Sequence, residues 1–315
     1  MGSTTENPWA NIEFEMDPGK PWVNYTFNDK ADSDRIISIL SNLTNLNQLN
    51  LKRSAALFRG ESSTKFSLKP RLCRIATQMP LKEKLGYEFD SINYFRQRAP
   101  HYLPKRLLPS NPPQDIGEWL ALMQHYGAAT RLLDWTASVN IAFYFAVHER
   151  PDEDGCVWVL WHNEFQNSMP AYDYNLDEKS AHKIFTNREA FIEFGQSTAR
   201  PIVNVFDSTI KTERMVAQHS LFTYCHKQEA DHAEIIGNQI VSAYPIDSHG
   251  ENLTKQLCRF IISPSIKKYL REHLSKLGIS TATLFPGLDG LGRTINETFV
   301  THSEVYAPVW HNPGQ

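Results

Sequence analysis

The residues with the most evident chemical capacity lie in one short segment, residues 124–147. It begins Gln-His-Tyr-Gly, continues through Arg131 and Asp134, and ends in an apolar stretch. Core packing alone does not require so many polar residue types side by side. Further upstream, Arg59 ends an apolar run and precedes Gly60. Because an arginine fork can bind phosphate or carboxylate with two hydrogen bonds, the two segments together predict a site for an anionic or nucleotide-like ligand.

The bulk composition is that of an ordinary folded protein. Hydrophobic residues make up 41% and charged residues 21% of the 315 positions, which is typical of globular domains. The net charge of −3 gives no general attraction to nucleic acids or acidic membranes. No run approaches the roughly 18 apolar residues of a membrane span, and the first residues lack the apolar stretch of a signal peptide. We therefore expect no membrane partner.

The four cysteines carry no pairing or metal-binding pattern. Cys73, Cys156, Cys225 and Cys258 are scattered, and no two of them form a Cys-x-x-Cys pair. This spacing is typical of buried thiols in a reducing compartment, so it predicts a cytoplasmic location. The histidines near Cys225 do not have the spacing of a zinc site, and we expect no metal.

The order of predicted elements indicates the fold class. Residues 1–30 have no clear period and are interpreted as an irregular arm, and residues 163–200 as a polar excursion of loop and helix. Expected helices cover residues 32–46, 81–98, 116–127, 138–146 and 264–277, and expected strands cover residues 54–58, 156–161, 201–206, 220–224 and 258–262. Helices and strands follow one another irregularly. This order favours the α+β class, with a mixed or antiparallel sheet core and flanking helices.

Four segments resemble those of a known family. Leu57-Phe58-Arg59-Gly60, and Gln124-His125-Tyr126-Gly127 followed by residues 130–136, are similar to the FRG domain, which is named for an aromatic-Arg-Gly motif. Residues 214–223 and 284–290 resemble later family segments, although His219-Ser220 departs from the usual pattern. The resemblance implies an FRG domain over residues 50–295, an N-terminal extension with a helix over 1–49, and a C-terminal tail over 296–315. The family occurs mostly in bacteria and their phages, and its name implies a fold unit more than an activity.

The order of motifs is also similar to that of ADP-ribosyltransferases. Those enzymes have an aromatic-Arg-Gly strand end, a Ser/Thr-rich strand end before an Ala/Phe-rich helix, and a final strand bearing Glu. Phe58-Arg59-Gly60 matches the first element, residues 134–138 and 142–146 match the second, and Gln218 stands at the third. Because an amide there replaces the carboxylate, Glu213 is an alternative acid. The resemblance implies a split sheet, NAD as the substrate, and a bacterial toxin or antiphage defence setting, with transfer to a protein or nucleic acid, or simple hydrolysis.

This resemblance gives the polar residues roles in breaking the bond to nicotinamide. Arg59 would anchor the dinucleotide, and Gly60 would let it approach the backbone. Thr136 and Ser138 would order the ribose hydroxyls. A carboxylate would stabilise the oxocarbenium-like sugar, with Asp134 nearest in sequence.

Further side chains would complete the ligand site. Tyr126 or Trp135 could stack on nicotinamide or adenine. Arg71 and Arg131 are expected as secondary anion contacts, and His125 as a ligand contact or an acid–base group.

Structural roles compete with these assignments. Arg59 could form a buried bridge with Asp134, which could otherwise brace its own turn. Thr136 could only cap the helix that follows. Trp135 could belong to the core, and Gln218 could satisfy a loop carbonyl group.

A second segment raises a different function. Residues 96–106 are basic and interleaved with aromatic side chains, so they could meet a nucleic acid, although a solvated helix face has the same composition. Two alternatives to the enzyme therefore stay open: a non-catalytic module that binds a nucleotide or nucleic acid, and a protein interaction domain.

Overall fold

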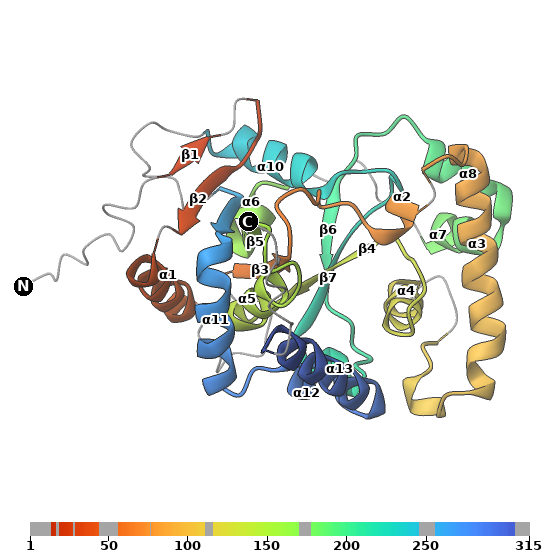
Figure 1. Ribbon diagram of the computed structural model, residues 1–315. Coiled ribbons are helices and arrows are strands. Elements are labelled where there is room, and N and C mark those ends of the chain that lie inside the picture. The colour runs from red at the N-terminus through yellow and green to blue at the C-terminus, as the bar shows by residue number, and fades with distance from the viewer. Residues whose placement is uncertain are drawn as a thin grey trace, which may run out of the picture.

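The computed structural model describes residues 14–16, 19–27, 29–43, 56–75, 77–110, 116–169, 178–245 and 256–305. The chain forms one open sheet with helices packed on both of its faces (Figure 1). The strand order is β1-β2-β8-β5-β3-β4-β7-β6, in which only the β2–β8 pair is parallel. The strands are β1 (Glu15–Met16), β2 (Val23–Phe27), β3 (Ala56–Glu61), β4 (Leu132–Thr136), β5 (Gly155–Trp161), β6 (Val203–Phe206), β7 (Ser220–Cys225) and β8 (Cys258–Ile262). The predicted α+β class is confirmed.

Nine helices of the described residues pack on or beside the sheet in three groups. The helix bounds are α1 (Lys30–Leu43), α2 (Arg71–Ile75), α3 (Leu81–Arg98), α4 (Ile116–His125), α5 (Val139–Val147), α6 (His162–Asn167), α7 (Glu178–Thr186), α8 (Arg188–Gln196), α9 (Glu213–Ala217), α10 (His232–Ala243), α11 (Pro264–Lys276), α12 (Thr281–Leu284) and α13 (Leu288–Val305), with short 3₁₀ helices η2 (Ala99–His101) and η3 (Lys105–Leu107). One group, α1, α5 and α11, covers one face of the sheet, and α6 and α10 cover the other. The third group, α3, α4, α7 and α8, packs beside β4 and β7 (Figure 1).

The sheet narrows to a single residue pair between β3 and β4. Strand β3 pairs with β5 over six residues and β4 pairs with β7 over five, but β3 and β4 meet only at Phe58 and Thr136. Beyond that pair, the two strands are no longer joined by ladder hydrogen bonds. The sheet is therefore continuous but almost divided, and the residues that follow Phe58 lie at the division.

The alternation of side chains along β3 decides which residues reach this division. Ala56 and Phe58 pack with α5, whereas Leu57 belongs to the core on the opposite face. Because successive strand residues point to opposite faces, Arg59 continues the face of Leu57 and Gly60 the face of Phe58. A Cβ atom at Gly60 would lie 1.9 Å from the carbonyl oxygen of Ala142, so the missing side chain lets α5 pack directly on the strand.

Several predicted elements agree with the structure, and others were missed. The strands expected at 156–161 and 258–262 and the helix at 81–98 lie within a residue of β5, β8 and α3. The interpretation of residues 1–30 as an irregular arm was wrong over residues 23–27, which form β2. That strand is buried on both faces at most positions, so its residues show no period-two pattern. The expected excursion at 163–200 contains α7 and α8. Residues 44–46 of the expected helix at 32–46, and residues 54–55 of the expected strand at 54–58, lie outside the described residues.

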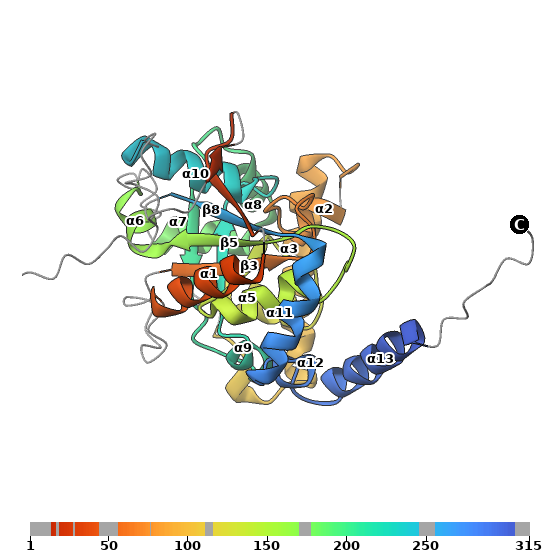
Figure 2. The same ribbon diagram turned by 60° about the vertical axis from the view of Figure 1, so that its left-hand side comes forward.

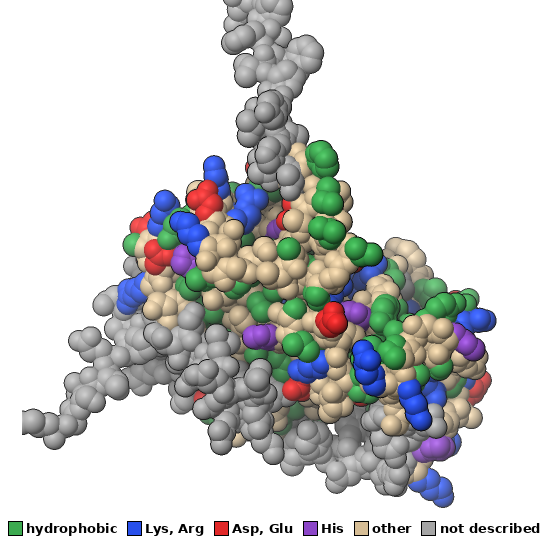
Figure 3. Space-filling model, turned by 90° about the horizontal axis from the view of Figure 1, so that it is seen from below, with side chains coloured by type: hydrophobic (Ala, Val, Ile, Leu, Met, Phe, Trp, Pro, Cys, Tyr) green, Lys and Arg blue, Asp and Glu red, His purple; other side chains and the backbone are tan. Residues whose placement is uncertain are grey.

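Helix α13 projects from the body of the molecule (Figure 2). It crosses the boundary at residue 295 that the sequence predicted for the C-terminal tail. Leu288, Leu291, Ile295 and Phe299 are all exposed on it, and Figure 3 shows apolar side chains in a row there. Within the described ranges, no helix is long and apolar enough to cross a membrane. All four cysteines are buried, and none of them forms a disulfide.

Candidate active site

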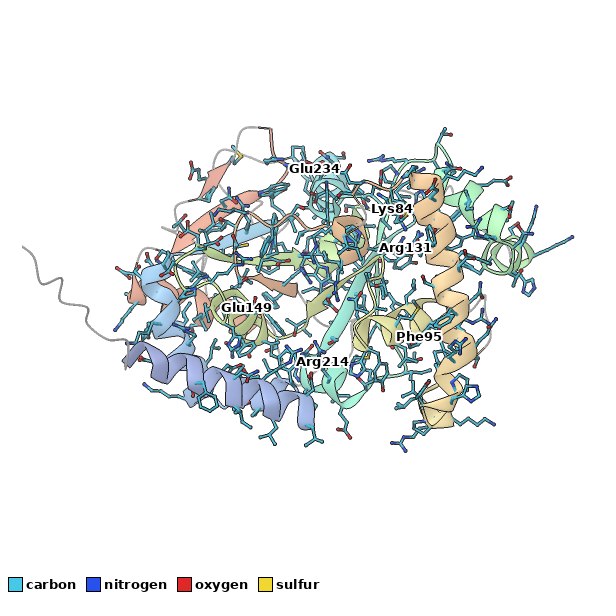
Figure 4. All side chains as sticks on the ribbon, turned by 45° about the vertical axis from the view of Figure 1, so that its right-hand side comes forward. Lys84, Phe95, Arg131, Glu149, Arg214 and Glu234 are labelled. Carbon is cyan, nitrogen blue, oxygen red and sulfur yellow. The ribbon has the colours of Figure 1, made fainter. Side chains whose placement is uncertain are left out.

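A cleft of about 690 Å³ opens where β3 and β4 part. Small-molecule sites in proteins commonly have volumes of about 300–1,000 Å³, a range that includes this cleft. The cleft is lined from β3, β4, α2, α4, α5, α9 and the C-terminal helices. Two of its residues, Glu149 and Arg214, lie near the lower edge of the sheet above α13 (Figure 4).

A polar network crosses the division in the sheet. Arg59 donates from Nε to Glu61 Oε1 at 2.7 Å and from Nη1 to the Asp134 backbone oxygen at 2.6 Å. The Asp134 carboxylate lies 3.8 Å from the same Nη1 and accepts a 2.7 Å hydrogen bond from Gln124 Nε2. The Thr130 hydroxyl donates in turn to Gln124. Residues of both sequence motifs are therefore joined in one hydrogen-bonded chain beside the cleft.

Arg59 forms the bridge that the sequence left open and also lies in the cleft lining. Its side chain is 14% exposed and bridges to Asp134, as the structural interpretation expected, yet it also lines the cleft. Its stronger ion pair is with Glu61, a cleft carboxylate that the sequence reasoning missed. The sequence did contain a signal for Glu61, because residues two apart on a strand share a face and Glu61 follows Arg59 by two positions.

Thr136 connects the strand end to the far wall of the cleft. Its hydroxyl donates to the Gln218 backbone oxygen at 2.8 Å and accepts from the Ser138 N–H at 3.1 Å. The Gln218 side chain, at the end of α9, donates to the Leu284 backbone oxygen at 3.0 Å. Gln218 therefore lines the cleft, but its amide is engaged with a carbonyl group, as the structural alternative proposed.

The C-terminal helices supply a wall that the sequence did not predict. Arg214 and Arg293 both lie over the Phe285 ring, with guanidinium carbons 4.6 and 4.5 Å from its centroid. His148 Nε2 is 2.9 Å from the Glu297 carboxylate. All five residues line the cleft, which therefore carries cations and carboxylates on both sides. Only contacts between residues distant in the sequence bring this wall to the site.

Two of the expected ligand contacts, Arg71 on α2 and His125 at the end of α4, line the cleft. Arg71 lines the cleft and donates to the Gly127 backbone oxygen at 3.0 Å, and Arg74 lies beside it. His125 also lines the cleft, with Nδ1 3.1 Å from the Thr212 hydroxyl. Burial lowers the pKa of His125, and the positive charge of Arg214 lowers it further. His125 is therefore predominantly neutral near pH 7.

Arg131 and Trp135 are structural residues. The interpretation of Arg131 as an anion contact was wrong, because its guanidinium is buried against the Glu88 carboxylate, with Nε 2.6 Å from Oε1. It points toward α3 (Figure 4) and also donates to the His226 backbone oxygen. Trp135 touches the cleft, but its ring lies in the apolar core and its indole donates to the Thr223 hydroxyl, so it offers no open face for stacking.

Four further expectations need correction. Gly60 lines the cleft, but α5 fills the space of its missing side chain, so close helix packing explains the glycine. Ser138 is the buried N-cap of α5 and does not line the cleft, and its hydroxyl makes no capping hydrogen bond. Glu213 and Tyr126 are exposed and lie outside the cleft lining. Tyr126 instead packs edge-on against His125, with ring centroids 4.7 Å apart.

A buried hydrogen-bond chain behind Trp135 predicts sensitivity to acid. The indole can only donate, so the Thr223 hydroxyl accepts from it and keeps its own hydrogen available for His232 Nδ1, 2.9 Å away. Accepting that hydrogen requires the neutral imidazole of His232. Burial lowers its pKa to about 3, with a smaller contribution from Arg59. Because the unfolded histidine titrates near pH ~6.5, the unfolded state takes up the proton first as the pH falls.

The contribution of His232 to the free energy of unfolding should be fully present above about pH 6.5. Below that pH it should fall by up to ~1.4 kcal/mol per pH unit. In the His232→Gln variant that contribution is absent, so its urea midpoints should depend less on pH between about 6.5 and 4.5. Other histidines are common to both proteins and cancel in the comparison. Equal slopes for the two proteins would contradict the neutral buried imidazole.

Among the described residues, no group of three or more His, Cys, Asp or Glu side chains is placed to hold a metal ion.

Comparison with known proteins identifies part of the chain. Residues 54–155 match the FRG domain, a range that includes Arg59, Glu61 and Asp134 but not Arg214 or α13. The wider range of 50–295 stays a prediction. Neither the curated proteins nor the solved structures give a match. The chain therefore contains an FRG domain over residues 54–155.

Proposed function

We propose that the cleft binds NAD and supports cleavage of its bond to nicotinamide, with transfer of ADP-ribose to a protein or nucleic acid, or to water. The observation that carries this proposal is the meeting of Arg59, Glu61 and Asp134 in one open cleft at the division of the sheet. A cation for the dinucleotide and carboxylates for a positive sugar are the groups that this chemistry needs.

The geometry favours a different acid from the one expected. The amide of Gln218 is hydrogen-bonded to a backbone carbonyl, and Glu213 lies outside the cleft lining. Glu61 and Asp134 both line the cleft, and each is oriented by a donor that fixes one carboxylate oxygen. We therefore assign stabilisation of the oxocarbenium-like ribose to Glu61, with Asp134 as its neighbour.

The remaining cations fit the phosphates of a dinucleotide. Arg71 and Arg74 line one wall of the cleft, and Arg214 and Arg293 line another. Arginine suits a pyrophosphate because it stays charged and can make two parallel hydrogen bonds. The bacterial and phage distribution of the FRG family supports a role as a toxin or an antiphage defence effector.

One observation favours a second candidate, a non-catalytic nucleotide-binding module. The charge of Arg59 is already matched by Glu61 at 2.7 Å, and Gln218 offers no free carboxylate. A cleft with these pairs could bind a nucleotide without breaking it.

Release of nicotinamide from NAD tests the proposal. We expect the wild-type protein to release free nicotinamide, measured by chromatography, with and without cell extract as a source of acceptors. Glu61→Gln should lower the rate by at least about 100-fold, because it removes the charge that stabilises the transition state. The amide keeps an oxygen that can accept from Arg59. Glu272→Gln, on the exposed side of α11, is the matched control and should leave the rate unchanged.

Binding is measured in parallel by thermal shift. NAD or ADP-ribose at 100 times its dissociation constant should stabilise the wild type by about 2.7 kcal/mol. Stabilisation without any nicotinamide release would favour the non-catalytic module. Absence of both would overturn the nucleotide assignment.

A further inference from the structure

The end of α3 carries a concentration of positive charge that the cleft does not use. Residues 91–110 contain four Lys or Arg residues and no Asp or Glu, although the whole chain has a net charge of −3. The basic side chains are Arg96, Arg98, Lys105 and Arg106, on α3 and η3. None of these four lines the cleft. We call the exposed surface of residues 94–106 the basic end.

Three of the four cations of the basic end are open to solvent. Arg98, Lys105 and Arg106 are exposed, and the described part of the chain gives none of them an ion pair. Lys and Arg side chains spread over the right-hand part of the face in Figure 3, where α3 ends. Because their charges are not neutralised by nearby carboxylates, they remain available to a polyanion.

Two tyrosines stand among these cations. Tyr102 is 83% exposed and Tyr94 is 61% exposed, so neither ring is packed into the core. The Arg98 guanidinium lies over the Tyr94 ring, 4.3 Å from its centroid, which holds the arginine at the surface. Tyr102 keeps an open ring face beside Lys105 and Arg106 in the sequence.

A small apolar cluster makes this surface rigid. Trp119 and Leu122 of α4 pack with Ala99, Phe95 and neighbouring leucines beneath the basic end (Figure 4 labels Phe95). The Trp119 indole donates to the Ser110 backbone oxygen at 3.0 Å, which ties the end of the segment to α4. Cations and rings on a fixed support lose less conformational entropy when they bind.

We propose that the basic end binds single-stranded nucleic acid. Cations can contact phosphates, and exposed rings can stack on bases, which is the combination found in proteins that bind single strands. A duplex hides its bases from such rings, and an acidic peptide without aromatic residues offers no ring for them to stack on. The proposal goes beyond the proposed function and does not depend on it, because binding here requires no turnover of NAD.

Fluorescence anisotropy with a labelled single-stranded oligonucleotide of about 16 nucleotides tests the proposal, with the full chain at low salt. The charge-reversal variant Arg98→Glu/Lys105→Glu/Arg106→Glu should abolish measurable binding. Tyr102→Ala should weaken binding about fivefold or more through lost stacking. Neutralising three phosphate contacts with Arg98→Gln/Lys105→Gln/Arg106→Gln should reduce the slope of log affinity against log salt by about 2.

A matched control uses three exposed cations elsewhere on the chain. Lys268→Glu/Arg271→Glu/Lys276→Glu on α11 makes the same change in net charge and should bind like the wild type. Equal losses in both charge-reversal variants would overturn the proposal, because the effect would then be one of net charge alone. Failure of the wild type to bind, or binding of polyglutamate at the basic end in place of the oligonucleotide, would overturn it as well.

Discussion

Replacing Arg131 with methionine should lower the free energy of unfolding by about 3–5 kcal/mol. The variant leaves the Glu88 carboxylate buried without its cation, although Gln228 still donates to it at 2.8 Å. A buried charge without a partner is strongly unfavourable, whereas the intact pair is held by two parallel hydrogen bonds. Urea denaturation at neutral pH measures the loss directly.

The control is an exposed ion pair whose carboxylate lies on α3, the helix that also carries Glu88. Arg188 lies 3.2 Å from Asp90 of α3, but both side chains are about half exposed. Arg188→Met should therefore change stability by less than about 1 kcal/mol. The double variant Arg131→Met/Glu88→Met should recover much of the loss, because no buried charge remains. Equal effects of Arg131→Met and Arg188→Met would show that the buried pair has no special weight.

Replacing Gly60 with alanine should destabilise the protein by about 3 kcal/mol or more, the upper end of the range for overpacking. The new Cβ would lie 1.9 Å from the Ala142 oxygen and 2.8 Å from the Ala146 nitrogen. Both are backbone atoms of α5, so no side-chain rotation can relieve the contact. The shift of unfolding midpoint in urea is the measurement.

Gly127 separates this steric effect from a general effect of glycine replacement. It also lines the cleft, and its φ is +87°, but no atom lies within 4 Å of the Cβ that alanine would add. Gly127→Ala should therefore be destabilising by only about 1–2 kcal/mol, the penalty of a left-handed backbone. A Gly60→Ala variant no less stable than Gly127→Ala would disprove the close packing of α5 on β3.

The sequence could predict which motifs meet but not which arginine faces the cleft. Arg59 and Arg131 both stand in polar motifs next to apolar residues, and their composition does not distinguish them. The difference comes from Glu88, which lies 43 residues before Arg131 and looks like an ordinary surface acid of an amphipathic helix. Because α3 turns that carboxylate toward β4, Arg131 becomes structural and Arg59 is left at the opening.

Elements that depend on distant pairing were the ones missed. β2 lies beside β8 in a parallel ladder that joins residues 23–27 to residues 258–262. Local periodicity carries no information about such a partner. The wall formed by Arg214, Phe285 and Arg293 is hidden for the same reason. In contrast, the buried helix α5 and strand β5 are apolar enough to be visible from their own residues.

A single residue pair, Phe58–Thr136, connects the two half-sheets, so fewer ladder hydrogen bonds join the halves to each other than join the strands within each half. Each half is held internally by full ladders, whereas the gap between them is spanned by Arg59, Asp134 and their neighbours. None of these side-chain contacts belongs to a strand ladder. Substitutions among these side chains can therefore alter the lining of the opening while the ladders that hold the fold stay intact.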